Sequence, residues 1–209
     1  MSRLRVHCLS MSLDGFVAGP DQGPEQPLGK GGPGLHEWVF ETRAGRAMTG
    51  GEGGTEGLDH RMVADGFTGI GATLMGRNMF GPIRGPWTGD WQGWWGPNPP
   101  YHHPVFVLTH HPREPLEMDG GTTFHFVTDG LESALEQAFA AAGSQDVRLG
   151  GGAATVRACL DKKFVDDLHL AVVPVLLGSG VRRFGSLDGY RARPVESAGA
   201  VAHVRFTKA

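Results

Sequence analysis

The sequence predicts an α/β fold whose sheet is mixed, mainly parallel in the middle of the chain and antiparallel at its C-terminal end. Two observations support this. Through the middle of the chain, apolar runs of strand length alternate with segments that suit helices, an order typical of parallel sheets. The last third consists mostly of strand-like segments, which favours antiparallel neighbours. The chain has 209 residues with no internal repeat or linker, so we expect one domain over 1–209.

In the first half of the chain, the spacing of apolar residues marks each expected element. These elements are, in order, a strand over 4–11, a continuation past a turn over 14–19, a helix over 36–48, a helical turn over 61–67, a buried strand over 72–75, and a short helix after Gly76 that ends near Pro82. The aromatic, proline-rich segment that follows, 84–100, is expected to be a long loop.

The second half contains the clearest helix of the chain, over 129–143. Asp129 is expected to cap it and Gly143 to end it. Three residues share its apolar face, namely Leu131, Leu135 and Ala138. The other expected elements are strands over 104–108, 123–128 and 165–173, a strand, glycine turn and helix over 146–164, and a final strand over 200–208.

Composition excludes several classes of protein. The net charge of −3 gives no positive field that would attract nucleic acid. No apolar run is long enough to span a membrane and the N-terminus does not read as a signal peptide, so a cytoplasmic protein is expected. Cys8 and Cys159 lie in apolar segments without metal-ligand spacing, and we expect buried, reduced thiols.

Glycine is unusually common, at 34 residues, and three glycines stand in "VRLGGGAATV" where a strand meets a helix. The strand is expected to end near Leu149 and the helix to start near Ala153. A helix N-terminus exposes N–H groups, and glycines let a phosphate approach them. The turn is therefore a candidate pyrophosphate cradle, made of Gly151, Gly152, Ala153, Ala154 and Thr155. Neither common phosphate fingerprint is present, and a tight, closely packed turn is the alternative.

Two further strand ends carry groups that suit a phosphate. Gly76 and Arg77 follow one buried strand, and the guanidinium fork of Arg77 fits phosphate, with a surface ion pair as the alternative. Thr109 and His110 follow another strand. Together the three strand ends indicate a dinucleotide lying across the edge of the sheet. No metal site is expected from the adjacent histidine pairs, which are residues 102, 103, 110 and 111.

Taken in order, these motifs resemble the dihydrofolate reductase-like superfamily, and more closely the RibD C-terminal family, the reductase domain of bacterial riboflavin biosynthesis. The resemblance covers nearly the whole chain and rests on five motifs: "LSMSLDGFVAG", "LMGRNMFG", "VFVLTHHP", "VRLGGGAATV" and "DDLHLAVVPVLLGSGVRRF". The last motif favours the riboflavin-type branch. The resemblance implies a three-layer α/β/α fold and NADPH as the cofactor.

The resemblance also implies roles for single residues. Gly76 and Arg77 would contact the phosphates of NADPH, with Arg77 near the ribose 2′-phosphate. Thr109 and His110 would flank the adenosine, and the glycine turn would hold the pyrophosphate. The backbone of two residues after the first strand would meet the nicotinamide, namely Val17 and Ala18.

On the substrate side, the expected residues are Asp14, Trp38, Trp91 and Trp95. Asp14 is the candidate for polarising the substrate or delivering a proton, and an Asp-Gly turn is the alternative. Dihydrofolate reductases carry a carboxylate on their first helix; Glu37 or Glu41 is its counterpart here, or Trp38 takes its place.

The long loop is rich in tryptophan, at positions 87, 91, 94 and 95. These indole rings either wall a site for a planar ring or form a satellite core beneath the loop. No extra basic cluster marks a site for a substrate phosphate.

The expected function is NADPH-dependent reduction of a small heterocyclic or carbonyl substrate. The reaction most like that of the family is reduction of 5-amino-6-(5-phosphoribosylamino)uracil in riboflavin biosynthesis. A protein that binds a drug or metabolite without turnover is the alternative. A homodimer is also expected, because one of the apolar C-terminal strands would otherwise form an exposed sheet edge, although loops or the long helix could cover that edge.

Overall fold

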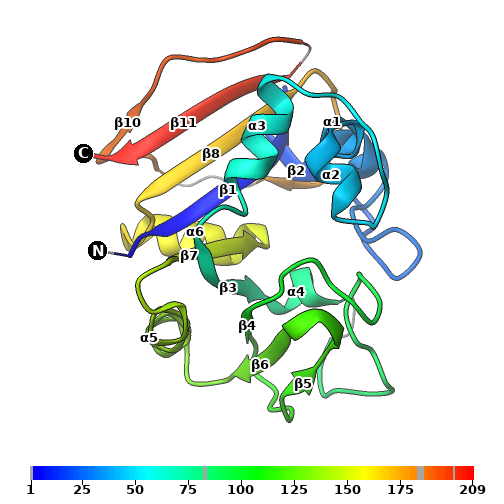
Figure 1. The fold of residues 1–209 in the computed structure, drawn as a ribbon, viewed down its shortest axis with the longest axis vertical. Coiled ribbons are helices and arrows are strands. Elements are labelled where there is room, and N and C mark those ends of the chain that lie inside the picture. Colours follow the sequence, from blue (N-terminus) through cyan, green and yellow to red (C-terminus); the bar gives the residue numbers. More distant parts are fainter. Residues whose placement is uncertain (1, 82–83, 183–185, 200) are drawn as a thin grey trace.

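The computed structural model describes residues 2–81, 84–182, 186–199 and 201–209. A nine-stranded sheet forms its centre, in the order β10-β11-β8-β1-β7-β3-β4-β6-β5 (Figure 1). The strands of this sheet are β1 Leu4–Ser12, β3 Ile70–Gly76, β4 Pro104–Leu108, β5 Leu116–Glu117, β6 Thr123–Val127, β7 Asp146–Gly151, β8 Asp167–Val173, β10 Tyr190–Ala192 and β11 Ala202–Lys208. A second, two-stranded sheet pairs β2 (Phe16–Ala18) with β9 (Val181–Arg182).

The expected mixed sheet is confirmed. The strands from β8 through β1, β7, β3 and β4 to β6 are all parallel to their neighbours. At one end of the sheet β11 pairs antiparallel with β8, and β10 pairs antiparallel with β11. At the other end the short strand β5 pairs antiparallel with β6.

Helices cover both faces of this sheet, which gives the expected three layers (Figure 1). The α-helices are α1 Glu37–Glu41, α2 Arg43–Ala47, α3 Leu58–Asp65, α4 Arg77–Phe80, α5 Leu131–Ala142 and α6 Ala153–Asp161. Strand β8 shows how the faces are divided. Leu168 and Leu170 join the core beneath α5 and α6, whereas Ala171 and Val173 join the core beneath α1 and α3. Alternate residues of a strand point to opposite faces, so the two helix layers lie on opposite sides.

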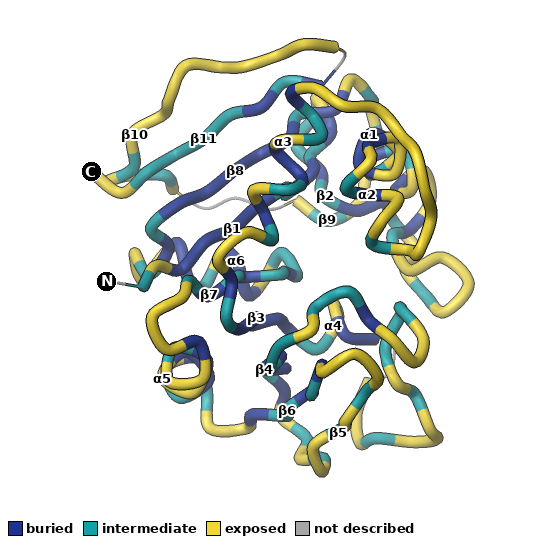
Figure 2. Tube along the Cα trace, in the orientation of Figure 1, coloured by how far each residue is buried: buried dark blue, intermediate teal, exposed yellow. Residues whose placement is uncertain are grey.

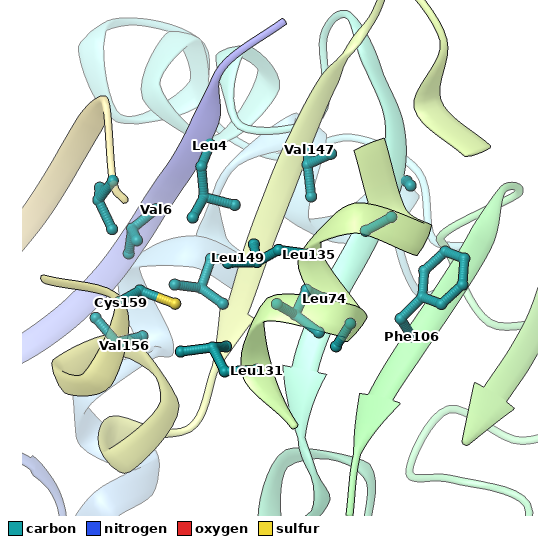
Figure 3. Packing of buried hydrophobic residues seen from close by; sticks show 14 of the residues in the cluster. Leu4, Val6, Leu74, Phe106, Leu131, Leu135, Val147, Leu149, Val156 and Cys159 are labelled. Carbon is teal, nitrogen blue, oxygen red and sulfur yellow. The ribbon is translucent and has the colours of Figure 1, made fainter. Parts of the chain in front are cut away.

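The larger core lies between the sheet and the pair α5 and α6 (Figure 3). Leu131 and Leu135 of α5 and Val156 of α6 meet the apolar side chains of the central strands there. Cys159 is buried in the same core and Cys8 is partly buried, and both thiols are free, as expected. Figure 2 shows that burial is concentrated in the central strands, while the long connections are largely exposed.

Two local expectations for helices are wrong. The segment 36–48 forms two short helices, α1 and α2, rather than one. Thr42 separates them because its backbone is extended, with φ −78° and ψ 155°, and its hydroxyl accepts a hydrogen bond from the Gly45 amide at 3.0 Å. Asp129 does not cap α5: the N-cap residue is Gly130, and the Asp129 carboxylate accepts a hydrogen bond from the Thr128 hydroxyl at 3.4 Å.

Strand β7 continues two residues beyond the expected end near Leu149, because Gly151 still pairs with Met75 of β3. Gly143 ends α5 with φ +62°, as expected, and the apolar face of α5 is buried as expected. Pro82 and Ala200, at the ends of two expected elements, lie outside the described residues.

A line of buried histidines crosses the sheet beneath α3. The Cys8 amide donates to His169 Nδ1 at 3.2 Å, His169 Nε2 lies 3.1 Å from His203 Nδ1, and His203 Nε2 lies 2.9 Å from Asp59 Oδ1. Because Nδ1 of His169 accepts, its Nε2 must carry the proton and donate to His203, which in turn donates to the carboxylate. The geometry thus fixes which ring nitrogen of each histidine donates.

The expectation of an uncovered C-terminal strand is wrong. Strand β8 lies between β1 and β11, and β11 is covered along its outer side by β10 and the residues after it. Arg193 N donates to Arg205 O at 2.7 Å, and Glu196 and His203 exchange two backbone hydrogen bonds. The same chain therefore covers this edge. Among the described residues, no helix has the length and apolar character needed to cross a membrane.

Candidate cofactor and substrate site

The three strand ends singled out in the sequence lie side by side in the fold. Strand β3 is flanked by β7 and β4, and all three run in the same direction. Met75 pairs with Gly151 on one side, and Gly76 pairs with Leu108 on the other. The glycine turn, Arg77 and Thr109 therefore leave the sheet at one edge, which is where parallel α/β sheets bind ligands.

Gly76 is needed for packing at this edge. A Cβ at position 76 would collide with the side-chain oxygen of Thr155, in the first turn of α6. Thr155 is itself buried. The absence of a side chain at Gly76 therefore lets the N-terminus of α6 approach β3 closely.

Gly152, by contrast, faces open space. A Cβ there would meet no atom within 4 Å, and its φ of −76° is open to any residue. Gly151 has φ +114°, which favours glycine, and the peptide between the two glycines is cis. No side chain caps α6, which begins at Ala153. Open space beside an uncapped helix N-terminus is a fit for the pyrophosphate of a dinucleotide.

Arg77 directly follows β3 at the same edge, and its side chain reaches Thr109 at the end of β4. Its Nη1 donates to the Thr109 hydroxyl at 3.3 Å, and its guanidinium carbon lies 3.6 Å from the ring centroid of Trp87. Burial, followed by repulsion from Arg84 and Arg113, lowers the pKa of Arg77. A bound phosphate would offset this repulsion. Arg84 and Arg113 were missed by sequence analysis, since each lies in an irregular segment that gives no local signal.

His110 and His111 differ in their surroundings. His110 is exposed, while the His111 amide donates to the Thr109 hydroxyl at 3.2 Å and its carbonyl accepts from Trp87 Nε1 at 2.9 Å. Hydrogen bonds therefore connect Thr109, His111 and Trp87 beside the guanidinium group of Arg77.

Asp14 has a different setting from the one expected for a proton donor. Its carboxylate accepts hydrogen bonds from the Ser12 hydroxyl at 2.6 Å, the Leu177 amide at 3.2 Å and the Gly178 amide at 2.7 Å. The Ser12 bond is the largest of the causes that lower the pKa of Asp14 to about 2. This setting favours the ionised carboxylate, so it supports polarisation of a substrate more than delivery of a proton, and the role of Asp14 stays a prediction. Asp14 also fastens the loop after β8 to the turn after β1.

Val17 and Ala18 lie in β2, directly after this turn. Ala18 pairs with Val181 of β9 and is 7% exposed. Val17 is half-buried. The hydrogen bonds of the Asp14 carboxylate therefore also help to fix β2, the strand expected to meet the nicotinamide.

The tryptophans of the long loop divide between two roles. Trp87 and Trp91 pack on the apolar cluster around Phe80, and Trp91 Nε1 donates to the Phe80 carbonyl at 3.0 Å. Trp94 and Trp95 instead line a cavity of about 620 Å³, opposite the end of α2 at Met48. Trp87 and Trp91 therefore form the satellite core, whereas a site for a planar ring stays a prediction for the part of the loop at Trp94 and Trp95. Trp91 contacts Trp94 edge to face, with the two ring centroids 4.6 Å apart.

The first helices do not bring their candidate residues into this cavity. Trp38 is 6% exposed within the core beneath α1, and its Nε1 donates to the Ser10 hydroxyl at 3.0 Å. Glu37 and Glu41 are exposed and line a separate groove of about 360 Å³ with Phe40. Among the residues that the structure describes, no group of three or more histidines, cysteines or carboxylates is arranged to hold a metal ion.

One residue that sequence analysis missed is Arg148 of β7. It alternates with the buried residues Val147 and Leu149 and so points to the opposite face. Its guanidinium carbon lies 4.1 Å from the ring centroid of Phe67. The strand pattern contains this signal, but one arginine in a strand cannot be distinguished from a solvent-facing residue without the topology.

The fold and the arrangement of its strand ends define an α/β protein of the dihydrofolate reductase type. The chain belongs to the RibD C-terminal domain family, whose model matches residues 6–198. The family resemblance expected from the motifs is thereby confirmed. Comparison with curated protein sequences gives no match.

Several solved structures share the fold. A protein from Shewanella sp. PV-4 described as a riboflavin biosynthesis protein is 20% identical, with a TM-score of 0.60 over 100% of this chain and 99% of its own. Dihydrofolate reductase from Enterococcus faecalis, complexed with NADP(H), is 13% identical, with a TM-score of 0.51 over 99% of this chain and 96% of its own. The deaminase and 5-amino-6-(5-phosphoribosylamino)uracil reductase of Thermotoga maritima is 13% identical, with a TM-score of 0.56, and this chain spans 57% of it.

Proposed function

We propose that the chain is an NADPH-dependent reductase that transfers hydride to a small heterocyclic or carbonyl substrate. The observation that supports this most directly is the edge formed by β7, β3 and β4. It combines open space beside an uncapped helix with a cluster of positive charge, in which Arg77 lies over Trp87 and is repelled by Arg84 and Arg113. Pyrophosphate and ribose 2′-phosphate need these two environments at one sheet edge.

When bound, NADPH would supply the hydride, and the chain would bind and orient it. The amides of Ala153 and Ala154 would hold the pyrophosphate beside Gly151 and Gly152, and Thr155 would support them from below. Arg77, assisted by Thr109 and His110, would bind the 2′-phosphate. The backbone at Val17 and Ala18, fixed through Asp14, would set the position of the nicotinamide.

The substrate would lie against the loop that carries Trp91, Trp94 and Trp95. Aromatic walls suit a planar ring, and the cavity volume of about 620 Å³ lies within the usual range for small-molecule sites. Family membership makes reduction of 5-amino-6-(5-phosphoribosylamino)uracil the first reaction to test. The two free thiols fit a reducing cytoplasm, where we propose that the enzyme acts.

The test is calorimetric titration with NADPH and NADH, followed by NADPH oxidation with a panel of heterocyclic and carbonyl compounds. We expect NADPH to bind more tightly than NADH and at least one compound to be reduced. Failure of NADPH to bind would contradict the proposal. Binding of NADPH and of panel compounds without oxidation would favour a non-catalytic binding protein.

We also propose a homodimer, through a surface other than the covered C-terminal edge. The exposed side chains Leu13 and Leu176 are 62% and 74% accessible. They lie on neighbouring loops, joined by a hydrogen bond from the Leu13 amide to the Val175 carbonyl at 3.0 Å. Exposed apolar pairs of this kind favour association. Light scattering that gives the mass of a single 22.3 kDa chain would contradict this proposal.

A further inference from the structure

Arg148 is a cation on the inner face of the sheet, away from the strand ends that bind the cofactor in our proposal. It lies near the start of β7, in register with Arg5 of β1 and Thr73 of β3. Its side chain is stacked on Phe67 and only partly accessible. Its Nε is buried and has no hydrogen-bond partner among the described residues.

No described ion pair involves Arg148; the carboxylate of Asp146, two residues along the same face of β7, is paired with Arg3 and Arg5. The groups that act on it electrostatically are Cys8, Tyr101 and Arg5, and none of them is a carboxylate. Burial is the main cause that lowers the pKa of Arg148. Nearby His103 is neutral at pH 7, because burial, with Arg148 second, lowers its pKa to about 4. Taking a cation partly out of water without pairing it with an anion costs free energy. An anionic ligand bound beside the cation would offset this cost.

The other cations of this region already have partners. Arg5 donates to the carbonyls of Thr68 and Asp65 and lies 3.5 Å from Asp146. Arg205 donates to Asp167 at 3.2 Å. Arg148 differs from both, since no described hydrogen bond or ion pair involves its side chain.

Two sets of shared neighbours connect Arg148 with the cavity opposite α2. Trp95, which lines the cavity, is among the groups that act on Tyr101, and Tyr101 in turn acts on Arg148. Phe67, on which Arg148 stacks, packs against the same apolar cluster as Met48, another lining residue. Arg148 therefore shares neighbours with residues that line the cavity, although it is not itself one of them. The nine lining residues include no lysine or arginine.

We propose that Arg148 binds an anionic group, a carboxylate or a phosphate, of the molecule that the protein reduces. This inference rests on the proposed reductase function and adds the charge of the substrate. The guanidinium fork would form paired hydrogen bonds with the anion, including one from Nε, while Phe67 holds the plane of the fork. The ring of the same molecule would then lie toward Trp95.

The first test measures thermal unfolding without any ligand, in Arg148→Met and Arg148→Lys. If Arg148 serves to bind an anion, it does not stabilise the ligand-free protein. Arg148→Met should therefore unfold at the same temperature as the wild type or higher. Arg148→Lys should stay close to the wild type. A clearly lower midpoint for Arg148→Met, with Arg148→Lys also lowered, would identify Arg148 as a structural residue and overturn the proposal.

The second test uses the anions alone, as inorganic phosphate and as acetate at matched ionic strength. Arg77→Ala serves as the background, so that the cofactor site does not contribute. We expect one of the two anions to raise the unfolding midpoint in this background and to lose about nine-tenths of that effect when Arg148→Met is added, the loss typical of one charge-assisted pair. The anion that acts distinguishes phosphate from carboxylate. Equal effects with and without Arg148, or no effect of either anion, would overturn the proposal.

The control is Arg157→Met, which removes an exposed arginine from α6 and should leave the anion effect unchanged. NADPH affinity is measured by calorimetry in the wild type and in Arg148→Met, and should be equal in both. The two proposals can therefore fail separately: loss of NADPH binding in the wild type concerns the reductase function, and the anion result concerns Arg148.

Discussion

The side-chain oxygen of Thr155 occupies the space that a Cβ at Gly76 would need. This contact joins the end of β3 to the first turn of α6, and so sets the distance between the two groups of phosphate-binding residues in our proposal. It also changes the interpretation of Gly76, which sequence analysis had assigned to the cofactor phosphates. The residue is required first by the packing of the protein itself.

Gly76→Ala should therefore destabilise the protein by about 1–3 kcal/mol, the usual cost of overpacking. The added methyl group would collide with the Thr155 hydroxyl. In the double variant with Thr155→Ala, the collision is removed and most of the loss should be recovered. Urea unfolding of both single variants and the double variant measures the coupling. Additive losses would show that the contact is not the cause.

Gly152→Val should fold normally and lose cofactor binding. Its backbone conformation is open to valine, and a Cβ would meet no protein atom within 4 Å. The branched side chain would then fill the space assigned to the pyrophosphate. Circular dichroism and calorimetric titration with NADPH test this together. Gly151→Val is a poorer test, because φ +114° strains any non-glycine residue. A folded Gly152→Val protein that binds NADPH normally would reduce the turn to a structural role.

Arg77→Ala should weaken NADPH binding by roughly 10- to 100-fold, the effect of losing a charge-assisted hydrogen bond. NADH has no 2′-phosphate, so its affinity should change little. Arg157→Ala, on the exposed side of α6, is the matched control. Calorimetry that shows equal losses for both nucleotides would remove Arg77 from 2′-phosphate recognition.

Asp14→Asn should weaken the hydrogen bonds that join the turn after β1 to the loop after β8, without abolishing hydride transfer. The folded-state pKa of Asp14 is lowered to about 2, so its stabilising effect is present above the ordinary value of 3.8 and is lost as the pH falls toward 2. The variant should accordingly be less stable than the wild type at pH 7, with a gap that narrows in acid. Steady-state rates should fall by less than about tenfold, below the usual contribution of a general acid. A loss of several hundredfold at unchanged stability would identify Asp14 as a proton donor.

The buried histidines should make the protein sensitive to mild acid. Burial is the largest cause that lowers the pKa of His7 to about 2 and of His169 to about 3. The unfolded chain binds protons near pH 6.5 and the folded chain does not, so stability falls as the pH drops below that value, by up to about 2 kcal/mol per histidine at pH 5.

Urea unfolding at several pH values measures this dependence. A plot of the unfolding free energy against pH has a slope set by the number of protons taken up on unfolding. His169→Asn should lower that number by about one between pH 6 and pH 4. His110→Asn is the control, since His110 is exposed and should leave the slope unchanged. Equal slopes in all three proteins would show that burial of His169 does not cause the acid sensitivity.

The sequence was sufficient for most of the fold and for the three strand ends. Apolar spacing located β1, β3, β4 and α5, because one-sided burial leaves a periodic pattern. It failed at Thr42, whose hydroxyl starts a new helix inside a continuous helical pattern. It also failed at the sheet edge, because β10 has only three residues and no clear apolar pattern.

The site was predicted less completely than the fold. Arg77 and Thr109 are brought together as expected, because both directly follow parallel strands. The hydrogen bonds of Asp14 come from amides more than 160 residues away, and Arg148 stands out because its buried Nε has no hydrogen-bond partner among the described residues. Neither relationship has a local pattern, since each arises only when distant segments meet.

The position of β1 has a consequence for how the chain folds. This strand precedes all the other strands of the sheet in sequence, yet it lies between β7 and β8, and Leu4 pairs with Val147 while Arg5 pairs with Asp167. The two partners of β1 thus follow it only after more than 130 residues of intervening chain, β7 at Asp146–Gly151 and β8 at Asp167–Val173. Strands β3, β4 and β6 can pair earlier, because they lie closer in sequence. Such a high contact order predicts slow completion of the sheet, with an unpaired apolar strand that needs protection during synthesis.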